Sequence, residues 1–119
     1  KYDIVVDGCD NFSTRNLIND ICAEKGKVYV YGAICGFEGQ VSVFHYGEEK
    51  KSYRDLYPDE EEMRRMPPPP KGVMGITPAV TGSIEATEVL KIICGFGEVL
   101  SGKLWTIDLR TLQSNKFSL

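Results

Sequence analysis

A short segment near the start of the chain carries the residues best suited to chemistry. Asp7-Gly8-Cys9-Asp10-Asn11, with Arg15 four positions further on, follows directly after the hydrophobic run Ile4-Val5-Val6. A hydrophobic strand that turns straight into a helix is typical of ligand sites in α/β proteins. The unpaired N–H groups and the positive end of the helix dipole then face the crevice at the carboxyl end of the strand. The segment therefore predicts a site for an anionic ligand.

Asp10 is the residue of this segment that points to a metal. A carboxylate beside bound phosphates makes chemical sense as a ligand of Mg²⁺, which accepts one or two protein carboxylates and completes its coordination with water and phosphate oxygens. The alternative is that Asp10 or Asn11 is simply the N-cap of the helix, because both residue types are preferred caps. The residues alone leave both interpretations open.

The composition is that of one soluble domain or of a piece of one. The chain has 119 residues, of which 42% are hydrophobic and 26% charged, enough for a modest core. No run approaches the roughly 20 apolar residues of a membrane helix and no secretory signal is present, so we expect a cytoplasmic protein without a membrane partner. The net charge of −3, without a clustered basic face, argues against nucleic acid as a partner. Because the chain starts at Lys1 and both ends read as strands, we expect an excised portion of a larger domain.

The cysteines and the single histidine predict no metal clip and no nucleophilic triad. The four cysteines are too widely spaced for a Cys-x-x-Cys pair. Cys22 and Cys94 fall on predicted apolar helix faces, so we interpret the cysteines as reduced core thiols. Two disulfides are the alternative that an even count allows, but a chain this rich in aliphatic residues does not need them. His45 has no Ser or Cys nucleophile nearby in the sequence and is interpreted as an ordinary strand-end residue.

The first part of the chain predicts a parallel strand–helix–strand unit. After the first strand, a helix packs through one apolar face, with Gly26 as its C-cap, and leads to a strand over residues 28–31. The residues expected on the buried face are Thr14, Leu17, Ile18, Ile21 and Cys22, and those expected to face away are Asn16, Asn19, Asp20 and Ala23. Residues 34–44 then predict a hairpin around a Gly-x-x-Gly turn. Phe37 in that turn is either an interface residue or tucked against its own strands.

The middle of the chain lacks a periodic pattern. From residue 47 to residue 71 charged residues alternate in sign and end in Pro67 to Pro70. A structureless stretch of that length is usually a lid, a binding loop or disordered, so we expect a long crossing loop that acts as a lid and is stiff at its proline-rich exit. A solvated connector without function is the alternative.

The last part of the chain predicts a helix and a terminal hairpin. Thr77 as N-cap and Pro78 at the first helical position open a helix that ends at Gly95. Its small and apolar face is expected to pack on the sheet, or else on the same helix of a partner, and it comprises Ala79, Gly82, Ser83, Ala86, Leu90 and Ile93. Residues 103–109 and 113–119 predict two antiparallel strands.

Nucleotide-binding glycine motifs are missing from the sequence. No G-x-G-x-x-G follows a strand and no G-x-x-x-x-G-K-[ST] occurs. A nucleotide served by Asp10 is therefore expected to be held mostly by residues outside this chain. A nicotinamide-dependent oxidoreductase is a distant alternative, because its fingerprint and its ribose-binding acidic residue are both absent.

Several motifs in order resemble the C-terminal half of the MoeB/ThiF/HesA proteins, bacterial relatives of ubiquitin-activating enzymes. The resemblance covers nearly the whole chain, and its specificity comes from the order of the motifs. They are Asp7-Gly8-Cys9-Asp10-Asn11 with Arg15, Tyr31-Gly32-Ala33-Ile34, Phe37-Glu38-Gly39-Gln40-Val41-Ser42-Val43-Phe44, Tyr53-Arg54-Asp55-Leu56-Tyr57-Pro58, Gly72-Val73-Met74-Gly75, Gly82-Ser83-Ile84-Glu85-Ala86 and Ser101-Gly102-Lys103-Leu104.

This resemblance implies the second half of a Rossmann-like domain, usually a homodimer, that uses ATP and Mg²⁺. The implied activity is adenylation of the C-terminal glycine of a ubiquitin-like sulfur-carrier protein in thiamine, molybdopterin or related sulfur transfer. Asp10 and Asn11 then match positions that hold Mg-ATP, with Asp10 as the catalytic residue. Arg15, together with Phe37, lies near the incoming carrier tail, and the segment before Gly72 covers that tail.

The departures from the family pattern limit what this chain is expected to do alone. Ser52 and Asp55 stand where the family's zinc-binding Cys-x-x-Cys would lie, so we predict no zinc. Prolines near Pro68 replace a loop cysteine used for covalent carrier adducts in some members. The fragment alone is expected to be inactive. The alternative is a non-catalytic binding or dimerisation module derived from the same fold. Because half a sheet would expose an apolar edge near residues 4–6, we expect a dimer.

Overall fold

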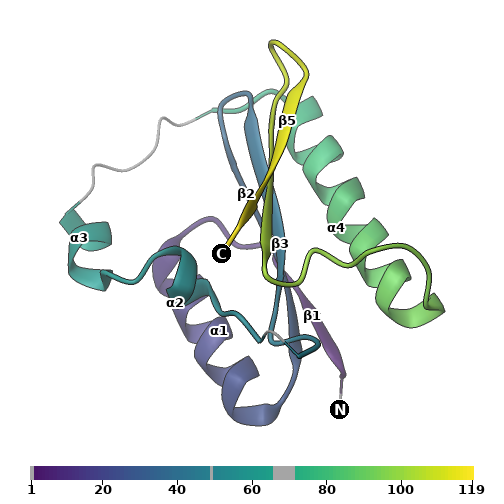
Figure 1. Ribbon diagram of the computed structural model, residues 1–119. Coiled ribbons are helices and arrows are strands. Elements are labelled where there is room, and N and C mark those ends of the chain that lie inside the picture. Colours follow the sequence, from purple (N-terminus) through teal and green to yellow (C-terminus); the bar gives the residue numbers. More distant parts are fainter. Residues whose placement is uncertain (1, 49, 66–71) are drawn as a thin grey trace.

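The computed structural model describes residues 2–48, 50–65 and 72–119, which form a five-stranded mixed sheet with helices on both faces (Figure 1). The first two strands are parallel, and every later neighbouring pair is antiparallel. The strands lie in the sheet in chain order and are β1 (Ile4–Val6), β2 (Val28–Cys35), β3 (Glu38–Phe44), β4 (Lys103–Asp108) and β5 (Gln113–Ser118). The predicted α/β fold, with its βαβ unit and its terminal antiparallel hairpin, is confirmed.

The helices divide between the two faces of the sheet. Helices α1 and α2 lie on one side of the sheet, and α4 crosses the other side (Figure 1). The described helices are α1 (Phe12–Lys25), α2 (Tyr53–Leu56), α3 (Glu60–Arg65) and α4 (Ile76–Cys94). Gly26 and Gly95 end α1 and α4 with φ of 67° and 71°, a left-handed conformation that glycine adopts without strain. Both C-caps are as predicted.

Strand β2 is longer than the sequence pattern predicts. It continues without a break into the hairpin, so that the strand expected over residues 28–31 and the first arm of the hairpin are one element. Cys35 pairs with Glu38, which leaves Gly36 and Phe37 as the turn, and Gly36 has a φ of 60°. The hairpin itself is confirmed, and its tight turn fixes the register of β2 against β3.

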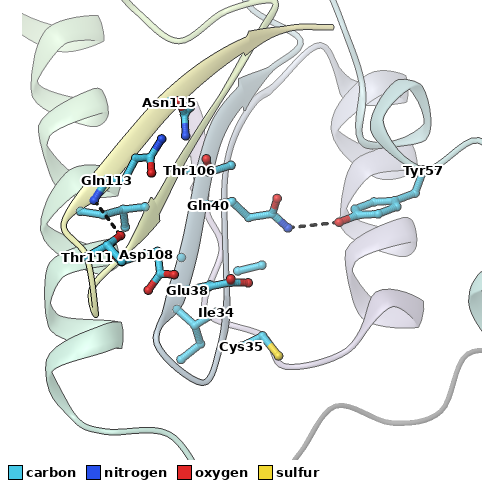
Figure 2. Close-up of a pocket in the computed structure, with 13 residues that line it drawn as sticks. Ile34, Cys35, Glu38, Gln40, Tyr57, Thr106, Asp108, Thr111, Gln113 and Asn115 are labelled. Carbon is cyan, nitrogen blue, oxygen red and sulfur yellow. Dashed lines mark hydrogen bonds between the residues drawn. The ribbon is translucent and has the colours of Figure 1, made fainter.

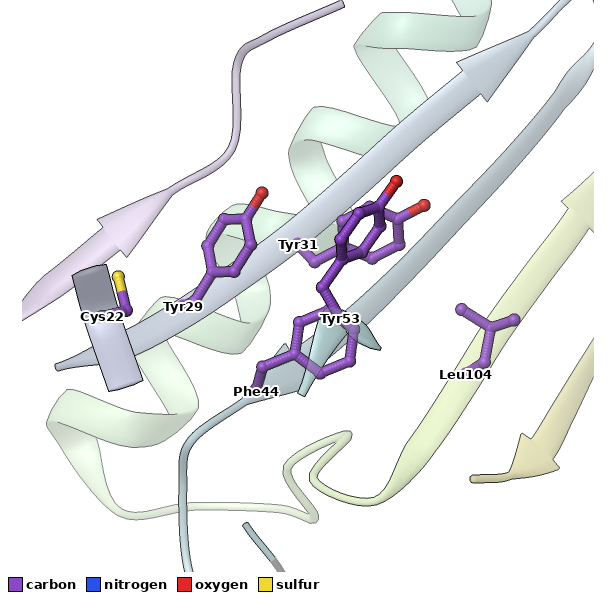
Figure 3. Packing of buried hydrophobic residues seen from close by; sticks show 6 residues of the cluster. All are labelled: Cys22, Tyr29, Tyr31, Phe44, Tyr53 and Leu104. Carbon is purple, nitrogen blue, oxygen red and sulfur yellow. The ribbon is translucent and has the colours of Figure 1, made fainter. Parts of the chain in front are cut away.

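An aromatic cluster fills the space between the sheet and the α1 and α2 side (Figure 3). Neighbouring rings in it have centroids 5.2–6.4 Å apart in tilted or edge-on arrangements, which are the favoured geometries for aromatic pairs. Its buried members are Cys22, Tyr29, Tyr31, Phe44, Tyr53 and Leu104. A smaller aliphatic cluster lies under α4 and comprises Val30, Val41, Val43 and Leu100.

The segment from residue 47 to residue 71 is not structureless where it is described, contrary to the prediction. It contains α2 and α3, and Tyr53 is fully inserted in the aromatic cluster. Two hydrogen bonds begin α2: the Ser52 hydroxyl oxygen accepts from the Arg54 N–H at 3.0 Å, and Asp55 Oδ2 accepts from the Ser52 N–H at 2.7 Å. This capping box stabilises a helix that is too short to show a hydrophobic period. The prolines 67–70, expected to stiffen the exit, lie outside the described residues.

Helix α1 packs through a face that agrees only in part with the prediction: Cys22 is buried and Ile18 packs against the core as predicted, but other positions differ. Asn16 and Asn19 are buried, whereas Leu17 and Ile21 are exposed, with 59% of the Leu17 surface accessible. Asn19 Oδ1 accepts a hydrogen bond from the Tyr53 N–H at 2.9 Å and lies 2.9 Å from His45 Nε2. The hydrogen bond from the Tyr53 N–H at the start of α2 therefore keeps Asn19 on the buried face of α1, against the apolar pattern of that helix.

The buried face of α4 is also the reverse of the predicted one. The small and apolar residues predicted for the buried face point outward, and the buried residues are Thr77, Thr81, Glu85 and Glu88. Other apolar residues of α4, namely Ile84, Val89 and Ile92, pack against the aliphatic cluster. The reason lies in the sheet, because a Cβ at Gly32 would collide with the Glu85 carboxyl group and a Cβ at Gly39 would collide with the Thr81 hydroxyl. These two glycines create the room into which polar side chains of α4 fit.

The start of α4 differs in detail from the prediction. The helix begins at Ile76, preceded by Gly75, and no side chain caps it. The Thr77 hydroxyl, predicted as the cap, donates instead to the Gly36 carbonyl at 2.9 Å and so ties the helix start to the β2–β3 turn.

The four cysteines are free, but they are not all core residues. Cys22 is buried, Cys9 is partly buried, and Cys35 and Cys94 are exposed. Cys94 is exposed because the face of α4 that carries it points outward. In the described part of the chain, no helix has the length and hydropathy that crossing a membrane would require.

Candidate functional site

Asp7 is the centre of a hydrogen-bond network at the carboxyl end of β1. Its carboxylate accepts from the Cys9 N–H at 3.0 Å, the Cys9 thiol at 3.0 Å, Arg15 Nε at 3.0 Å and the Tyr29 hydroxyl at 2.8 Å. The side chain of Asp7 is fully buried. Burial and the bond to Asp7 raise the pKa of the Cys9 thiol to about 11. Cys9 is therefore a hydrogen-bond donor here and not a thiolate nucleophile.

Arg15 is fixed between α1 and the end of β2. Besides its ion pair with Asp7, its Nη2 donates to the Cys9 carbonyl at 2.8 Å and approaches the Gly32 carbonyl at 3.4 Å. Its guanidinium carbon lies 5.7 Å from the centre of the Tyr31 ring, within the range of cation–π attraction. Arg15 thus holds the β1–α1 loop in place and is largely buried.

Asp10 and Asn11 lie at the exposed N-terminus of α1. Asn11 is the N-cap, because its Oδ1 accepts from the Thr14 N–H at 2.8 Å. Its side-chain amide donates to Asp10 Oδ1 at 3.0 Å. Asp10 itself is exposed. The capping function therefore falls to Asn11, and the Asp10 carboxylate, steered by Asn11, faces solvent at the positive end of the helix.

Phe37 is not brought together with Arg15. It lies in the β2–β3 turn, where the guanidinium carbon of Arg110 is 5.7 Å from its ring centre and its carbonyl accepts from the Leu109 N–H at 2.9 Å. It is absent from the residues that line the cavity beside Arg15. The Phe37 ring thus lies beside Arg110 of its own sheet, and its role at an interface stays a prediction.

A polar groove of about 590 Å³ runs along the α2 side of the sheet at the hairpin end (Figure 2). At its floor, Gln40 Nε2 donates to the Tyr31 hydroxyl at 2.8 Å and to the Tyr57 hydroxyl at 3.2 Å. Its polar lining includes Glu38, Thr106, Asp108, Gln113 and Asn115. Because Tyr31 also contacts Arg15, the groove is connected through one ring to the Asp7 network.

A second, smaller cavity of about 260 Å³ lies on the other side of β2, between the Asp7 loop and α4. Asp7 and Arg15 line it from one side, and Thr81 and Glu85 of α4 line it from the other. Ala33 and Ile34 line both hollows, so the end of β2 separates them. Burial, and secondarily the Asp7 charge, raise the pKa of Glu85 to about 8.

Sequence reasoning missed the residues that organise the site. Asp7 lies directly after the first strand, within the strand–helix–strand unit that the sequence predicted. The sequence did not show that its carboxylate accepts four hydrogen bonds, which come from the β1–α1 loop, α1 and β2. Glu85 gave no usable signal, because a glutamate in a helix is normally solvated. The Glu85 side chain can be buried because Gly32, in β2, has no Cβ in the space that the carboxyl group occupies.

Asp10 fits the way in which Mg²⁺ binds proteins, through one carboxylate with water and phosphate oxygens as the other ligands. Asp7 cannot serve as a ligand, because its oxygens accept hydrogen bonds from Cys9, Arg15 and Tyr29. In residues 2–48, 50–65 and 72–119, no cluster of three His, Cys, Asp or Glu forms a protein-only metal site. Ser52 and Asp55, which replace the zinc-ligand positions implied by the resemblance, bond to each other in the α2 capping box.

The mixed five-stranded sheet with helices on both faces is an α/β fold of the Rossmann type, and the ThiF family model matches residues 1–119. The chain belongs to the ThiF family.

The relatives and solved structures that it resembles are larger proteins. A probable molybdopterin-synthase adenylyltransferase of Pyropia yezoensis is 46% identical over the whole chain, which spans 32% of that protein. A sulfur carrier protein adenylyltransferase of Thermus thermophilus is 45% identical, in a match that covers 90% of this chain and 41% of that protein. The crystal structure of Escherichia coli MccB with ATP superposes on 98% of this chain with a TM-score of 0.76, at 19% sequence identity. The match covers 36% of the MccB chain. The chain thus spans about a third of these proteins, and the last likeness concerns the fold alone.

Proposed function

We propose that this chain is part of an ATP-dependent adenylyltransferase that activates the C-terminal glycine of a ubiquitin-like sulfur-carrier protein. The observation that carries the proposal is Asp10, an exposed carboxylate at the N-terminus of α1, held by Asn11 in a chain of the ThiF family. The names of its relatives support the same class of reaction. In this reaction the carrier carboxylate attacks the α-phosphorus of ATP, the new C–O–P bond forms, and pyrophosphate leaves.

The residues of this chain have separate roles in the proposal. Asp10, the catalytic residue, and Asn11 hold the Mg²⁺ that accompanies ATP, and Mg²⁺, when bound, neutralises charge on the phosphates. The buried Asp7–Arg15 pair fixes the loop that presents Asp10 and places Arg15 beside the carrier tail. Phe37, beyond the β2 end, contacts a more distant part of the carrier.

Carrier-dependent ATP–pyrophosphate exchange by the full-length protein tests this function. We expect Asp10→Ala to abolish exchange, because a metal-holding group that acts on developing charge contributes about 100-fold or more. Asp3→Ala is the matched control, since Asp3 is an exposed aspartate at the opposite end of β1. Absence of exchange by the unmodified protein with a panel of carriers that end in Gly-Gly would contradict the function and favour a binding module.

The proposal includes a homodimer. The outward face of α4 presents a row of small and apolar side chains, and 52% of the Leu90 surface is exposed. Within the described residues β1 pairs only with β2, and Val6 at this edge is also exposed. Sedimentation of the full-length protein tests the assembly. A monomer mass that is independent of concentration would contradict the dimer, and loss of association in Leu90→Glu would assign it to α4.

A further inference from the structure

Two adjacent residues of α1 hold two adjacent residues of α2. Asn19 Oδ1 accepts a hydrogen bond from the Tyr53 N–H at 2.9 Å. Next to it, the Asp20 carboxylate accepts two hydrogen bonds from Arg54, one from Nε to Oδ1 at 2.9 Å and one from Nη2 to Oδ2 at 2.8 Å. The Asn19 side-chain amide also donates to Asp20 Oδ1 at 3.3 Å. We name these four residues the α1–α2 clamp.

The two halves of the clamp are a buried bond and a partly exposed ion pair. Only 2% of the Asn19 surface is accessible, so losing Asn19 would leave a buried backbone N–H without an acceptor. The Asp20–Arg54 pair is partly exposed. Its guanidinium nevertheless bonds to both carboxylate oxygens, which is the geometry in which a surface ion pair contributes most. The hydrogen bonds from Arg54 also lower the pKa of Asp20, so the pair is charged at neutral pH.

The clamp holds α2 where the family resemblance implies a zinc site. Structural zinc sites in proteins are built from cysteine and histidine, but Ser52 and Asp55 stand at the implied ligand positions. Asp55 Oδ2 accepts from the Ser52 N–H, and the Ser52 hydroxyl oxygen accepts from the Arg54 N–H. This donor set does not fit zinc, and its oxygens already serve the start of α2.

Helix α2 in turn supports Tyr31 at two points. The centres of the Tyr53 and Tyr31 rings are 5.2 Å apart (Figure 3). Directly after α2, the Tyr57 hydroxyl accepts from Gln40 Nε2 at 3.2 Å, and the same nitrogen donates to the Tyr31 hydroxyl at 2.8 Å. The Arg15 guanidinium carbon lies 5.7 Å from the centre of the Tyr31 ring. The placement of α2 is therefore passed to Arg15 through one ring.

We propose that Asp20 and Arg54 are positioning residues, which hold α2 against Tyr31 without a metal ion and so keep Arg15 in place. The consequence for catalysis rests on the proposed function, in which Arg15 lies beside the carrier tail and Asp10 acts at the nucleotide. The clamp then governs how well the carrier binds and leaves the binding of ATP unaffected.

A double-mutant cycle in the full-length protein tests the clamp independently of catalysis. Asp20→Ala, Arg54→Ala and the double variant are compared by hydrogen exchange of the backbone amides of residues 53–57. We expect each single variant to exchange about fivefold faster, and the double variant to exchange no faster than Arg54→Ala. Glu24→Ala, an exposed acidic residue one turn further along α1, is the matched control. Unchanged rates in all variants, or effects that multiply in the double variant, would overturn the clamp.

Zinc removal tests whether α2 is held without a metal. The zinc content of the full-length protein is measured by mass spectrometry, and hydrogen exchange of residues 53–57 is compared before and after dialysis against EDTA. We expect the same exchange rates, because no bond of the clamp passes through a metal ion. Faster exchange of these residues after EDTA, reversed when zinc is returned, would overturn the proposal.

Carrier kinetics test whether the clamp acts through Tyr31 on Arg15. We expect Asp20→Ala to raise KM for the carrier about threefold and to leave kcat and KM for ATP unchanged. Tyr57→Phe, which removes the bond to Gln40 and leaves the clamp intact, should raise the carrier KM similarly. Adding Asp20→Ala to Tyr57→Phe should then raise it little further. A lower kcat with an unaltered carrier KM reflects a smaller folded fraction and would overturn the positioning role.

The two kinds of measurement separate this inference from the proposed function. Coupling between Asp20 and Arg54 in hydrogen exchange, found in a protein without adenylation activity, would remove the function and leave the clamp. Adenylation activity in a protein whose hydrogen exchange shows no such coupling would remove the clamp and leave the function.

Discussion

Asp7 and Glu85 are two buried carboxyl groups that line the same cavity from opposite sides, and they are held in opposite ways. Asp7 accepts hydrogen bonds from Cys9 in the β1–α1 loop, from Arg15 in α1 and from Tyr29 in β2. Its negative charge lies beside the Arg15 guanidinium. Glu85 reaches into space left by Gly32, its Oε1 has no partner among the described residues, and its pKa is raised to about 8. One carboxyl group is therefore fully hydrogen-bonded by its neighbours, and the other has a buried oxygen without a partner among the described residues.

The difference teaches which carboxyl group stabilises the fold and which one is buried at a cost in stability. A charge buried with several donors rigidifies its loop, and removing it leaves its partner uncompensated. A buried group without a partner costs stability and is retained where it serves another purpose. Three substitutions test this contrast and a fourth tests the α2 capping box on the same side of the sheet as Asp7, with expected effects that decrease in that order.

Replacing Asp7 should have the largest effect. Asp7→Ala leaves the largely buried Arg15 without its counter-ion and the Tyr29 hydroxyl without its acceptor. We expect a loss of about 3–5 kcal/mol in the free energy of unfolding of the full-length protein, measured with urea. Asp10→Ala, at an exposed position, should change stability little. A loss below about 1 kcal/mol for Asp7→Ala would mean that Arg15 finds other partners.

Filling the space under the Glu85 side chain should cause the second largest loss of stability. In Gly32→Ala the new methyl group collides with the Glu85 carboxyl, which must leave its place on the sheet. We expect a cost of about 1–3 kcal/mol, typical of overpacking. Gly8→Ala is the matched control, because a Cβ at Gly8 meets nothing within 4 Å. Equal stabilities of the two variants by thermal unfolding would show that α4 does not rely on Gly32.

The pH dependence of stability should identify the protonated Glu85. Its pKa rises from 4.5 to about 8 on folding, so the folded state binds a proton that the unfolded state has lost between these values. Stability conferred by this group is present below pH 4.5 and is lost as the pH rises towards 8. Relative to Glu85→Gln, the native protein should lose at least about 1.4 kcal/mol across this window. Parallel urea-derived profiles of the two proteins would refute a raised pKa.

The capping box of α2 should give the smallest effect. Ser52→Ala removes the side-chain acceptor of the Arg54 N–H and leaves the bond from the Ser52 N–H to Asp55 in place. We expect a loss of about 1 kcal/mol, seen as faster hydrogen exchange in α2 while β2 and β3 stay protected. Exchange at an unchanged rate in α2 would show that Tyr53 burial alone holds the helix.

Much of the fold was predictable because it rests on local signals. The helix ends at Gly26 and Gly95, the hairpin at Gly36 and the terminal antiparallel strands each follow from residue types within one turn or strand. The motif that contains Asp10 and Asn11 was also correctly predicted to lie where a strand runs into a capped helix, because this arrangement needs no distant contact to be recognised. Its role as a binding site stays a prediction.

The errors concern the buried faces of helices, contacts between distant residues, the length of β2, and the short helices α2 and α3 in a segment predicted to lack structure. The apolar periods of α1 and α4 predicted Leu17 and Leu90 as buried, and both are exposed. In α1 the deciding contact is Asn19 with the α2 backbone, and in α4 it is Glu85 over Gly32. Each involves a residue many positions away, and a helix pattern contains no information about the surface on which the helix will lie.

The sequence by itself determined the order of the strands and of the two long helices α1 and α4, the family and the position of Asp10, since these depend on neighbouring residues and on motifs. Only the tertiary structure decided that Asp7 is satisfied and that Glu85 is not. That distinction depends on where β2 places Gly32 and Tyr29 relative to two helices on opposite faces of the sheet. Burial and hydrogen bonding are properties of packed elements, so no local pattern records them.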